Sequence, residues 1–349
     1  MKRSLHMICL FLSAALIGGV ALISPYLPAD NGVFVEKRYA GWSGVLRCWV
    51  AADWTCAGNF NSWLNRCAAS FEKKHEGVYL EFTAVSPQAI REMGGEGLRP
   101  PEILFFSPGI LSDSHMLENW KPLCMGGYIW VYNCALMDEN DLISMQAGSM
   151  AELALLSGDM AKPVIPEPGI DLGLPVLSQN ADISLDSFID GEIPALCVNQ
   201  AELARLIRMR ENGRGPDWAC RISGEYALAN QLLLGGIVRQ NDENASERTP
   251  LARDFLAHLL TEDCQKMTAD IGAFPVTNIM AYSDFSPYSD MEQLLRSRTL
   301  LTPPVFSEYS AEAEAAIVRN YRSGKISARE GILQALAAGI YEINAYINR

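Results

Sequence analysis

The chain has 349 residues, of which 49% are hydrophobic and 20% charged, as in ordinary globular proteins, and its length favours two lobes over one. Its formal net charge is −13 at pH 7, and no basic face is evident in the sequence. Because phosphate binding needs clustered Lys and Arg side chains, we exclude nucleic acid as a partner.

The amino terminus predicts that the protein is attached to a membrane. Lys2 and Arg3 precede an uncharged run from Met7 to Ile23, which is at the short end of what spans a bilayer. Positive charge before such a run keeps the terminus in the cytoplasm and sends the following chain outward. We therefore expect the rest of the protein on the extracellular face of the cytoplasmic membrane.

The end of this run favours an anchor over a removed signal peptide. Pro25 and Pro28 break the helix, no clean small-x-small cleavage site is present, and Cys9 lies inside the apolar run instead of after it. Residues 1–28 are expected to form an uncleaved signal anchor, with a cleaved signal peptide as the alternative. Residues 29–41 are polar and irregular, which predicts a linker.

Eight cysteines lie outside the apolar run. An even number in an exported chain permits disulfides, whereas Cys48 and Cys197 fall in apolar strand-like runs where a free cysteine behaves as a small core residue. No Cys-x-x-Cys spacing occurs and the four histidines are scattered, so no metal site is expected. The pairs closest in sequence are Cys56 with Cys67 and Cys124 with Cys134.

The first part of the chain predicts a strand, a loop, a helix and a second strand. Residues 45–50 are apolar, residues 78–85 alternate, and the intervening helix repeats a buried-type residue every fourth position after a cap at Asn59 or Asn61. In an open α/β sheet, ligands lie beyond the carboxyl ends of the strands. The loop 53–60 is therefore the first place to expect a binding site.

Residues 87–133 predict a short helix, a loop and two strands. A short helix is expected at 87–93, and the glycines of 94–97 form a plain loop because no Gly-Lys-Ser/Thr ending follows them. The continuous apolar run 102–106 predicts a strand buried on both faces, which ends at Ser107. Residues 127–133 read as a strand, interpreted as one that crosses between lobes.

The middle of the chain is less regular. Only a weak helix near 150–156 is indicated between residues 138 and 187. A strand is then expected at 194–198, followed by a helix in which Asn199 and Glu202 form a capping-box-like pair.

The carboxyl half is mostly helical in its pattern. Residues 218–226 are strand-like, and an Ala- and Leu-rich helix is expected to follow through Leu234. Further helices are expected from Thr249-Pro250, from Thr261 to Gly272, and at about 311–322 and 328–347.

The order of these segments resembles the extracellular solute-binding proteins of ABC importers, in the group that transports sugars and oligosaccharides. The stretches that show the resemblance are the opening strand with its Trp54 loop, Phe71-Glu72-Lys73-Lys74-His75-Glu76-Gly77-Val78, Glu102 to Phe106, Phe188 to Ala195, and Phe255 to Val276. The final helical pair around Gly324-Lys325-Ile326-Ser327 also fits the pattern of this family.

The resemblance implies an α/β fold of the type II periplasmic-binding-protein kind: a two-lobe clamshell with crossing hinge strands and a helical carboxyl terminus. It implies a first lobe from residues 42–133 plus about 250–300, and a second from 134–249 plus about 301–349. A polar solute would be held between the lobes, which close by hinge motion around it.

Sugar recognition uses aromatic faces for the ring and carboxylates, amides or hydroxyls for its edges. Candidate residues are therefore polar and aromatic residues at the strand ends that would face the solute. The candidate ligand-binding residues are Asp53, Trp54, Asn59, Ser107, Asn199, Trp218, Tyr226 and Phe274, and the candidate hinge residues are Tyr132 and Asn133.

Several candidates also have a purely structural interpretation. Trp54 would pack its loop onto the lobe, Ser107 would be an ordinary turn residue, and Asn199 would be only a helix cap. Trp218 and Phe274 would belong to the core and to a structural turn.

The expected function is capture of a carbohydrate or similar polar solute for an ABC permease, by a membrane-tethered protein without cofactor or catalysis. The alternative is a solute-binding-like ectodomain that serves as an envelope sensor or structural partner. The chain lacks the cysteine that lipid-anchors relatives from Gram-positive bacteria, and its middle region is short, which supports that alternative. A glycoside hydrolase is a further alternative, although Gly41-Trp42-Ser43-Gly44 does not match the Gly-x-Ser-x-Gly motif.

Overall fold

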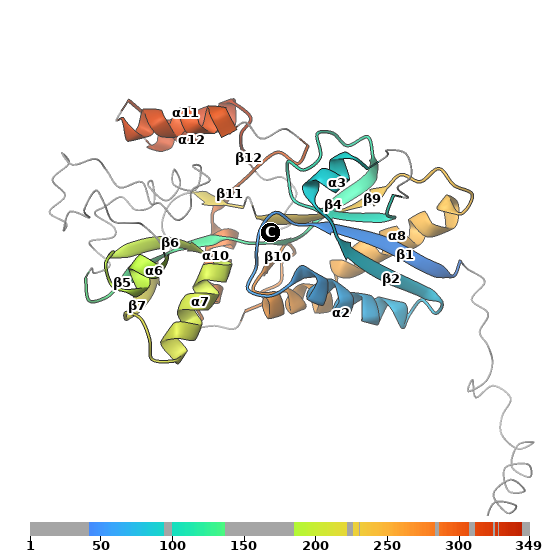
Figure 1. The fold of residues 1–349 in the computed structure, drawn as a ribbon, viewed down its shortest axis with the longest axis horizontal. Coiled ribbons are helices and arrows are strands. Elements are labelled where there is room, and N and C mark those ends of the chain that lie inside the picture. The colour runs from blue at the N-terminus through green and yellow to red at the C-terminus, as the bar shows by residue number, and fades with distance from the viewer. Residues whose placement is uncertain are drawn as a thin grey trace, which may run out of the picture. The chain divides into compact units, whose positions relative to one another are not determined.

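The computed structural model describes residues 42–93, 100–136, 185–221, 226–229, 231–282, 286–306, 311–323, 325–326 and 328–343. The expected anchor, linker and 150–156 helix lie outside these residues. Across the described ranges, no helix is both long and apolar enough to span a bilayer. The strands of this part form three sheets (Figure 1).

The largest sheet has six strands and defines what we call the first lobe. Its order is β10-β4-β9-β3-β1-β2. β1 pairs in parallel with β2 and β3, whereas β9 runs antiparallel to both β3 and β4, and β10 is antiparallel to β4. The strands are β1 (Gly44–Ala51), β2 (Val78–Ala84), β3 (Ile103–Phe106), β4 (Leu117–Met125), β9 (Leu232–Val238) and β10 (Phe274–Pro275).

Both faces of this sheet are covered. In β3, Ile103 and Phe105 enter one buried cluster, whereas Leu104 and Phe106 enter another on the opposite face. Side chains alternate along a strand, so a strand between two cores must be apolar at every position. The continuous apolar run 102–106 is thus confirmed as a strand buried on both sides.

Helix α2 (Phe60–Glu72) covers one face of the sheet. Asn59 caps it, with its side-chain oxygen accepting from the Asn61 N–H at 2.8 Å. The four-residue repeat buries Trp63, Cys67 and Phe71, as predicted. Phe71 then meets Phe255 of α8 (Ala245–Leu259) edge to face, with ring centroids 5.2 Å apart.

The helix expected to end at Leu234 is instead strand β9. Neighbouring side chains leave room only for small residues in this strand, because a Cβ on Gly235 would stand 2.6 Å from Leu123 Cδ1 and 2.8 Å from Leu256 Cδ2. Short apolar runs do not distinguish a buried strand from a helix by periodicity. The start expected at Thr249-Pro250 is also wrong, since α8 begins at Ala245 and includes Pro250.

The second lobe is built on a smaller antiparallel sheet in which β5 lies between β6 and β7. Its buried cluster joins this sheet to α6, α7 and α10 and to a third sheet, β12-β11-β8. The bounds are β5 (Tyr128–Asn133), α6 (Leu185–Ile189), β6 (Ala195–Asn199), α7 (Gln200–Glu211), β7 (Trp218–Arg221), β8 (Tyr226–Leu228), α10 (Pro287–Ser297), β11 (Thr299–Thr302) and β12 (Glu342–Ile343).

The remaining elements are short helices. Gly272 ends η2 in the left-handed conformation, with φ of 70°, as the sequence predicts. The last helix stops at Ala337, ten residues before the expected 347, and β12 follows it. These helices are α3 (Pro87–Arg91), α9 (Glu262–Lys266), the 3-10 helix η2 (Met267–Ile271), α11 (Ala311–Arg322) and α12 (Ala328–Ala337).

The sheets group segments that are distant in the chain. β4 pairs with β9 in the six-stranded sheet, whereas β5 pairs with β6 and β7, so the chain passes from one sheet to the other at Gly126-Gly127. β9 returns to the six-stranded sheet beside β3, and α10 packs into the second lobe's cluster. The expected lobe boundaries, 42–133 plus about 250–300 and 134–249 plus about 301–349, stay predictions.

Candidate ligand site at the junction of the lobes

Asp53 and Ser107 follow the neighbouring parallel strands β1 and β3. The Asp53 backbone N–H donates to the Ser107 Oγ at 3.1 Å. Ser107 is fully buried, whereas the Asp53 side chain is exposed. The structure therefore brings together two of the candidates because the carboxyl ends of parallel neighbours meet at one edge of the sheet.

The environment of Asp53 disfavours its charge. Desolvation by surrounding protein raises the pKa of this carboxyl above its ordinary value, although hydrogen bonds from the Ser107 side chain and the backbone lower it in part. An exposed but poorly solvated carboxylate is suited to accepting hydrogen bonds from a polar ligand.

Trp54 is part of the core and does not present an open ring face. It is 9% exposed, belongs to the first lobe's buried cluster and meets Phe60 edge to face at 4.7 Å. Among the described residues its indole N–H has no hydrogen-bond partner. The ring therefore packs the loop onto α2, which is its structural interpretation, and a role of Trp54 in ligand binding stays a prediction.

Asn199 forms the capping box that the sequence indicates. Its side-chain oxygen accepts from the N–H groups of Ala201 at 2.9 Å and Glu202 at 3.0 Å, and Glu202 accepts from the Asn199 N–H at 2.9 Å. Asn59 caps α2 through a single hydrogen bond from the Asn61 N–H and is exposed. Both amides are engaged in caps, which is their structural interpretation.

The aromatic candidates of the second half of the chain are also core residues. Trp218 is 3% exposed, with the Arg210 guanidinium 4.1 Å above its ring centre. Phe274 is fully buried beside Tyr282. Both rings therefore have their structural interpretation, and their roles in ligand binding stay predictions. For Tyr226, the structure describes only that its backbone starts β8 beside β11.

The expected hinge residues lie at the carboxyl end of β5. Tyr132 and Asn133 are its last two residues, and the Asn133 N–H donates to the Pro194 O at 2.8 Å inside the second lobe. The crossing itself is Gly126-Gly127. A Cβ on Gly126 would lie 2.5 Å from the Gln200 Nε2, so a larger residue here would force the Gln200 side chain to move.

Gln200 is a junction residue that the sequence reasoning missed. It is fully buried; its Nε2 donates to the Thr55 O at 3.0 Å, and its Oε1 accepts from the Gly127 N–H at 3.1 Å. The Tyr288 hydroxyl donates to the Gln200 O at 2.8 Å. Gln200 therefore ties the loop 53–59 to α7 and to the crossing. The only local signal was its place directly after the Asn199 cap.

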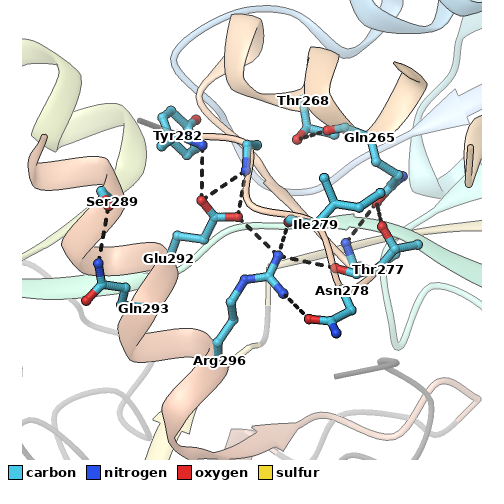
Figure 2. Close-up of polar contacts among 12 residues, drawn as sticks. Gln265, Thr268, Thr277, Asn278, Ile279, Tyr282, Ser289, Glu292, Gln293 and Arg296 are labelled. Carbon is cyan, nitrogen blue, oxygen red and sulfur yellow. Dashed lines mark hydrogen bonds and ion pairs between the residues drawn. The ribbon is translucent and has the colours of Figure 1, made fainter. Parts of the chain in front are cut away.

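A second connection, residues 276–282, follows β10 in the chain, and side chains of α9 and α10 form hydrogen bonds to its backbone (Figure 2). Gln265, fully buried in α9, accepts from the Val276 N–H at 3.0 Å and donates to the Leu123 O at 2.9 Å. Glu292, fully buried in α10, accepts from the backbone N–H of Ala281 at 3.0 Å and pairs with Arg296 at 3.2 Å.

Arg296 completes this fastening. Its guanidinium donates to the Thr277 O at 3.2 Å and also to the Ile279 O, so that two backbone carbonyls of this segment are paired (Figure 2). A buried carboxylate whose bonds are all satisfied by its own protein holds backbone in place. We interpret the 276–282 segment as a structural connection held in place by these bonds.

In the described ranges, no cluster of three or more His, Cys, Asp or Glu side chains is arranged to hold a metal.

No family model matches the chain, and no curated protein matches it by sequence. Solved structures do match its fold. A family 1 extracellular solute-binding protein from Bifidobacterium longum subsp. infantis aligns with a TM-score of 0.56 and 12% identity, over 86% of this chain and 99% of that one.

Two further solved structures match the fold of this chain. A sugar transporter from Rhizobium etli in an open conformation gives a TM-score of 0.51 at 13% identity, over 85% of this chain and 99% of that one. An ABC substrate-binding protein from Listeria monocytogenes in complex with cycloalternan gives 0.50 at 11% identity, over 85% and 98%. The protein therefore has the two-lobe α/β clamshell fold of extracellular solute-binding proteins, as predicted.

Proposed function

We propose that this protein captures a carbohydrate or similar polar solute between its two lobes and delivers it to an ABC permease. The observation that supports this most is the match of the whole fold, which extends over 86% of this chain and 99% of the solute-binding protein from Bifidobacterium longum subsp. infantis. That protein and the others named above are binding proteins or transporters, which fits a role without catalysis.

In this proposal, the ligand meets the loop 53–59 from the first lobe and the start of α7 from the second. Asp53 supplies a carboxylate to the hydroxyl groups of the solute, and Ser107 fixes the Asp53 backbone. Gln200 joins the two surfaces through the Thr55 O. The apolar run 7–23 tethers the protein to the outer face of the cytoplasmic membrane.

Ligand-dependent thermal stabilisation tests the proposal. Because a ligand that binds only the folded state raises stability with its concentration, a correct sugar at 100 times its Kd adds about 2.7 kcal/mol. The screen compares malto-oligosaccharides, cyclic oligosaccharides, monosaccharides and peptides on the chain from residue 42. Stabilisation by one carbohydrate class supports the proposal, and a flat response to all sugars contradicts it.

A second candidate is an ectodomain with the same fold and no transport role. It is favoured by the burial of Trp54, Trp218 and Phe274, since these rings are not displayed for stacking. In that case no solute would shift the melting temperature, and the protein would instead be recovered with envelope proteins after crosslinking on intact cells.

A further inference from the structure

An acceptor sequence for Asn-linked glycosylation lies where the chain enters α8. Asn244, Ala245 and Ser246 form an Asn-x-Ser triplet whose middle residue is not proline. No other Asn of the chain is followed two positions later by Ser or Thr. Such a triplet is an acceptor when it lies on the surface of an exported protein. Its position in the fold therefore decides whether a transferase can reach it.

The side chain of Asn244 is exposed and takes no part in capping the helix. Asn244 and Ser246 both lie on the surface, and Asn244 makes no side-chain cap bond although it begins α8. Its backbone N–H donates to the Asp242 Oδ1 at 3.1 Å, which fixes the turn before the helix. Asn199, in contrast, uses its side-chain oxygen to cap α7. The carboxamide of Asn244 is therefore presented to solvent from a defined turn.

The first turn of α8 also lacks one of its backbone hydrogen bonds. Pro250 lies inside the helix and has no N–H, so it cannot donate to the carbonyl of Ser246, four residues before it. The Asn244 O still accepts from the N–H groups of Glu247 and Arg248, each at 3.2 Å. A turn with fewer bonds opens at a smaller free-energy cost. The triplet can thus leave the helical conformation to enter the active site of a transferase.

The triplet lies away from the candidate ligand site. The Val238 N–H, at the carboxyl end of β9, donates to the Glu102 O just before β3, at 3.0 Å. The chain then continues into α8 from this end of the six-stranded sheet (Figure 1). Asp53 and Ser107 follow the opposite ends of β1 and β3. A bulky group on Asn244 would therefore leave those two residues uncovered.

We propose that Asn244 carries an Asn-linked oligosaccharide, added after the chain is exported. The inference rests on the export that the proposed function assumes. The donor is an oligosaccharide joined through its C1 to a lipid diphosphate, and a membrane-bound transferase catalyses the step. The Asn244 Nδ2 attacks C1, a C–N bond forms, and the bond from C1 to the phosphate oxygen breaks. The lipid diphosphate leaves with the electron pair, and the proton lost from Nδ2 passes to a base of the transferase and then to water.

The test is mass spectrometry of the full chain isolated from the membranes of the cells that make it. Trypsin cuts after Arg239 and Arg248, so residues 240–248 form one peptide that contains the triplet. Fragmentation that retains sugars on their residue then locates any added mass. We expect the mass of an oligosaccharide on Asn244. An unmodified peptide, or sugars found only on other residues, would overturn the proposal.

Two variants of one residue provide the matched control. Ser246→Ala destroys the acceptor sequence and should remove the added mass, whereas Ser246→Thr preserves the sequence and should keep it. Both positions are exposed, so both variants should fold. Modification of Asn244 in the Ser246→Ala variant, or its loss in both variants, would contradict the assignment.

Protease treatment of intact cells separates this inference from the proposed function. An unmodified Asn244 on a protein that external protease digests contradicts the inference alone. A protein that external protease does not reach contradicts export, and with it both the glycosylation and the capture of an external solute. No step uses a solute, so a flat response in the sugar screen leaves this result interpretable.

Discussion

At the scale of single residues, the Glu102 carboxylate is a charged group buried inside the first lobe, where loss of its partners would lower the stability of the fold. It is 2% exposed and accepts from the Arg47 N–H at 2.7 Å and from the Arg248 guanidinium at 2.8 Å. Arg248 is equally buried and also pairs with Asp242. A buried charge is tolerated only while its partners remain, so this network fixes β1, β3 and α8 in one arrangement.

We expect Glu102→Ala to lower the free energy of unfolding by about 3 kcal/mol, because Arg248 is left buried beside a single, half-exposed carboxylate. Urea denaturation measures the change. The matched control is Arg66→Ala, which breaks the exposed Arg66–Asp270 pair at 2.7 Å and should cost less than about 1 kcal/mol. Equal effects of the two substitutions would contradict this account of Glu102.

Asp53 gives a prediction with a pH signature. Its folded-state pKa is raised, chiefly by desolvation, so folding penalises the ionised form. Asp53→Asn should therefore melt at a higher temperature than the natural protein at pH 7. The gain should shrink as the pH falls through the raised pKa and vanish below the unfolded value of about 3.9. Thermal melts from pH 7 to pH 4 measure it, with Asp254→Asn on α8 as an exposed control. A gain that does not depend on pH would refute the assignment.

At the scale of secondary-structure elements, α7 and α8 begin in contrasting ways. Asn199 caps α7 through a complete capping box, whereas Asn244 stands at the start of α8 without a side-chain cap bond. The same residue type therefore provides its own control. The cap of α7 also fixes Gln200, the next residue, at the lobe junction.

Asn199→Ala should lower the free energy of unfolding by about 1 to 2 kcal/mol, since it leaves two N–H groups of α7 without their acceptor. Asn244→Ala should change it by only a few tenths of a kcal/mol. Chemical denaturation of both variants checks the difference. Identical costs would show that the capping box contributes nothing particular to stability.

The elements also show what the sequence could predict. Strong periodicity or clear caps identified β1, α2, β3, β6 and α7, because local pattern and burial agree there. The apolar run of β9 was assigned to a helix, since only its place between β3 and β4 reveals why two glycines stand in it. Strand β4 was missed altogether, because its burial is uneven and its register shifts twice along β9.

For the candidate site, the sequence placed Asp53 and Ser107 each at the carboxyl end of a strand, and in the structure the Asp53 N–H donates to the Ser107 Oγ; their role in binding a ligand stays a prediction. It could not predict which aromatic rings are displayed, because burial of Trp54 or Trp218 depends on side chains distant in sequence. Gln200 was missed for the same reason: its partners Thr55 and Gly127 lie far from it in the chain. Site contacts depend on tertiary packing more than on local pattern.

At the scale of the whole molecule, the chain passes from the six-stranded sheet to the sheet of β5 at Gly126-Gly127. A Cβ on Gly126 would press on the side chains of Gln200 and Gln231. Gly126→Ala should cost about 1 to 3 kcal/mol through overpacking. Adding Gln231→Ala should restore part of the loss, and denaturation of the single and double variants measures this coupling. Purely additive losses would contradict the close approach.

The central claim is that a polar solute is held by both lobes together. The most direct measurement is hydrogen–deuterium exchange of the chain from residue 42, with and without the carbohydrate that stabilises it most. Binding between the lobes predicts simultaneous protection of the loop 53–59 and of the start of α7 at residues 199–203, with α11 unchanged. Protection confined to one lobe, or no protection with any carbohydrate, would contradict the account.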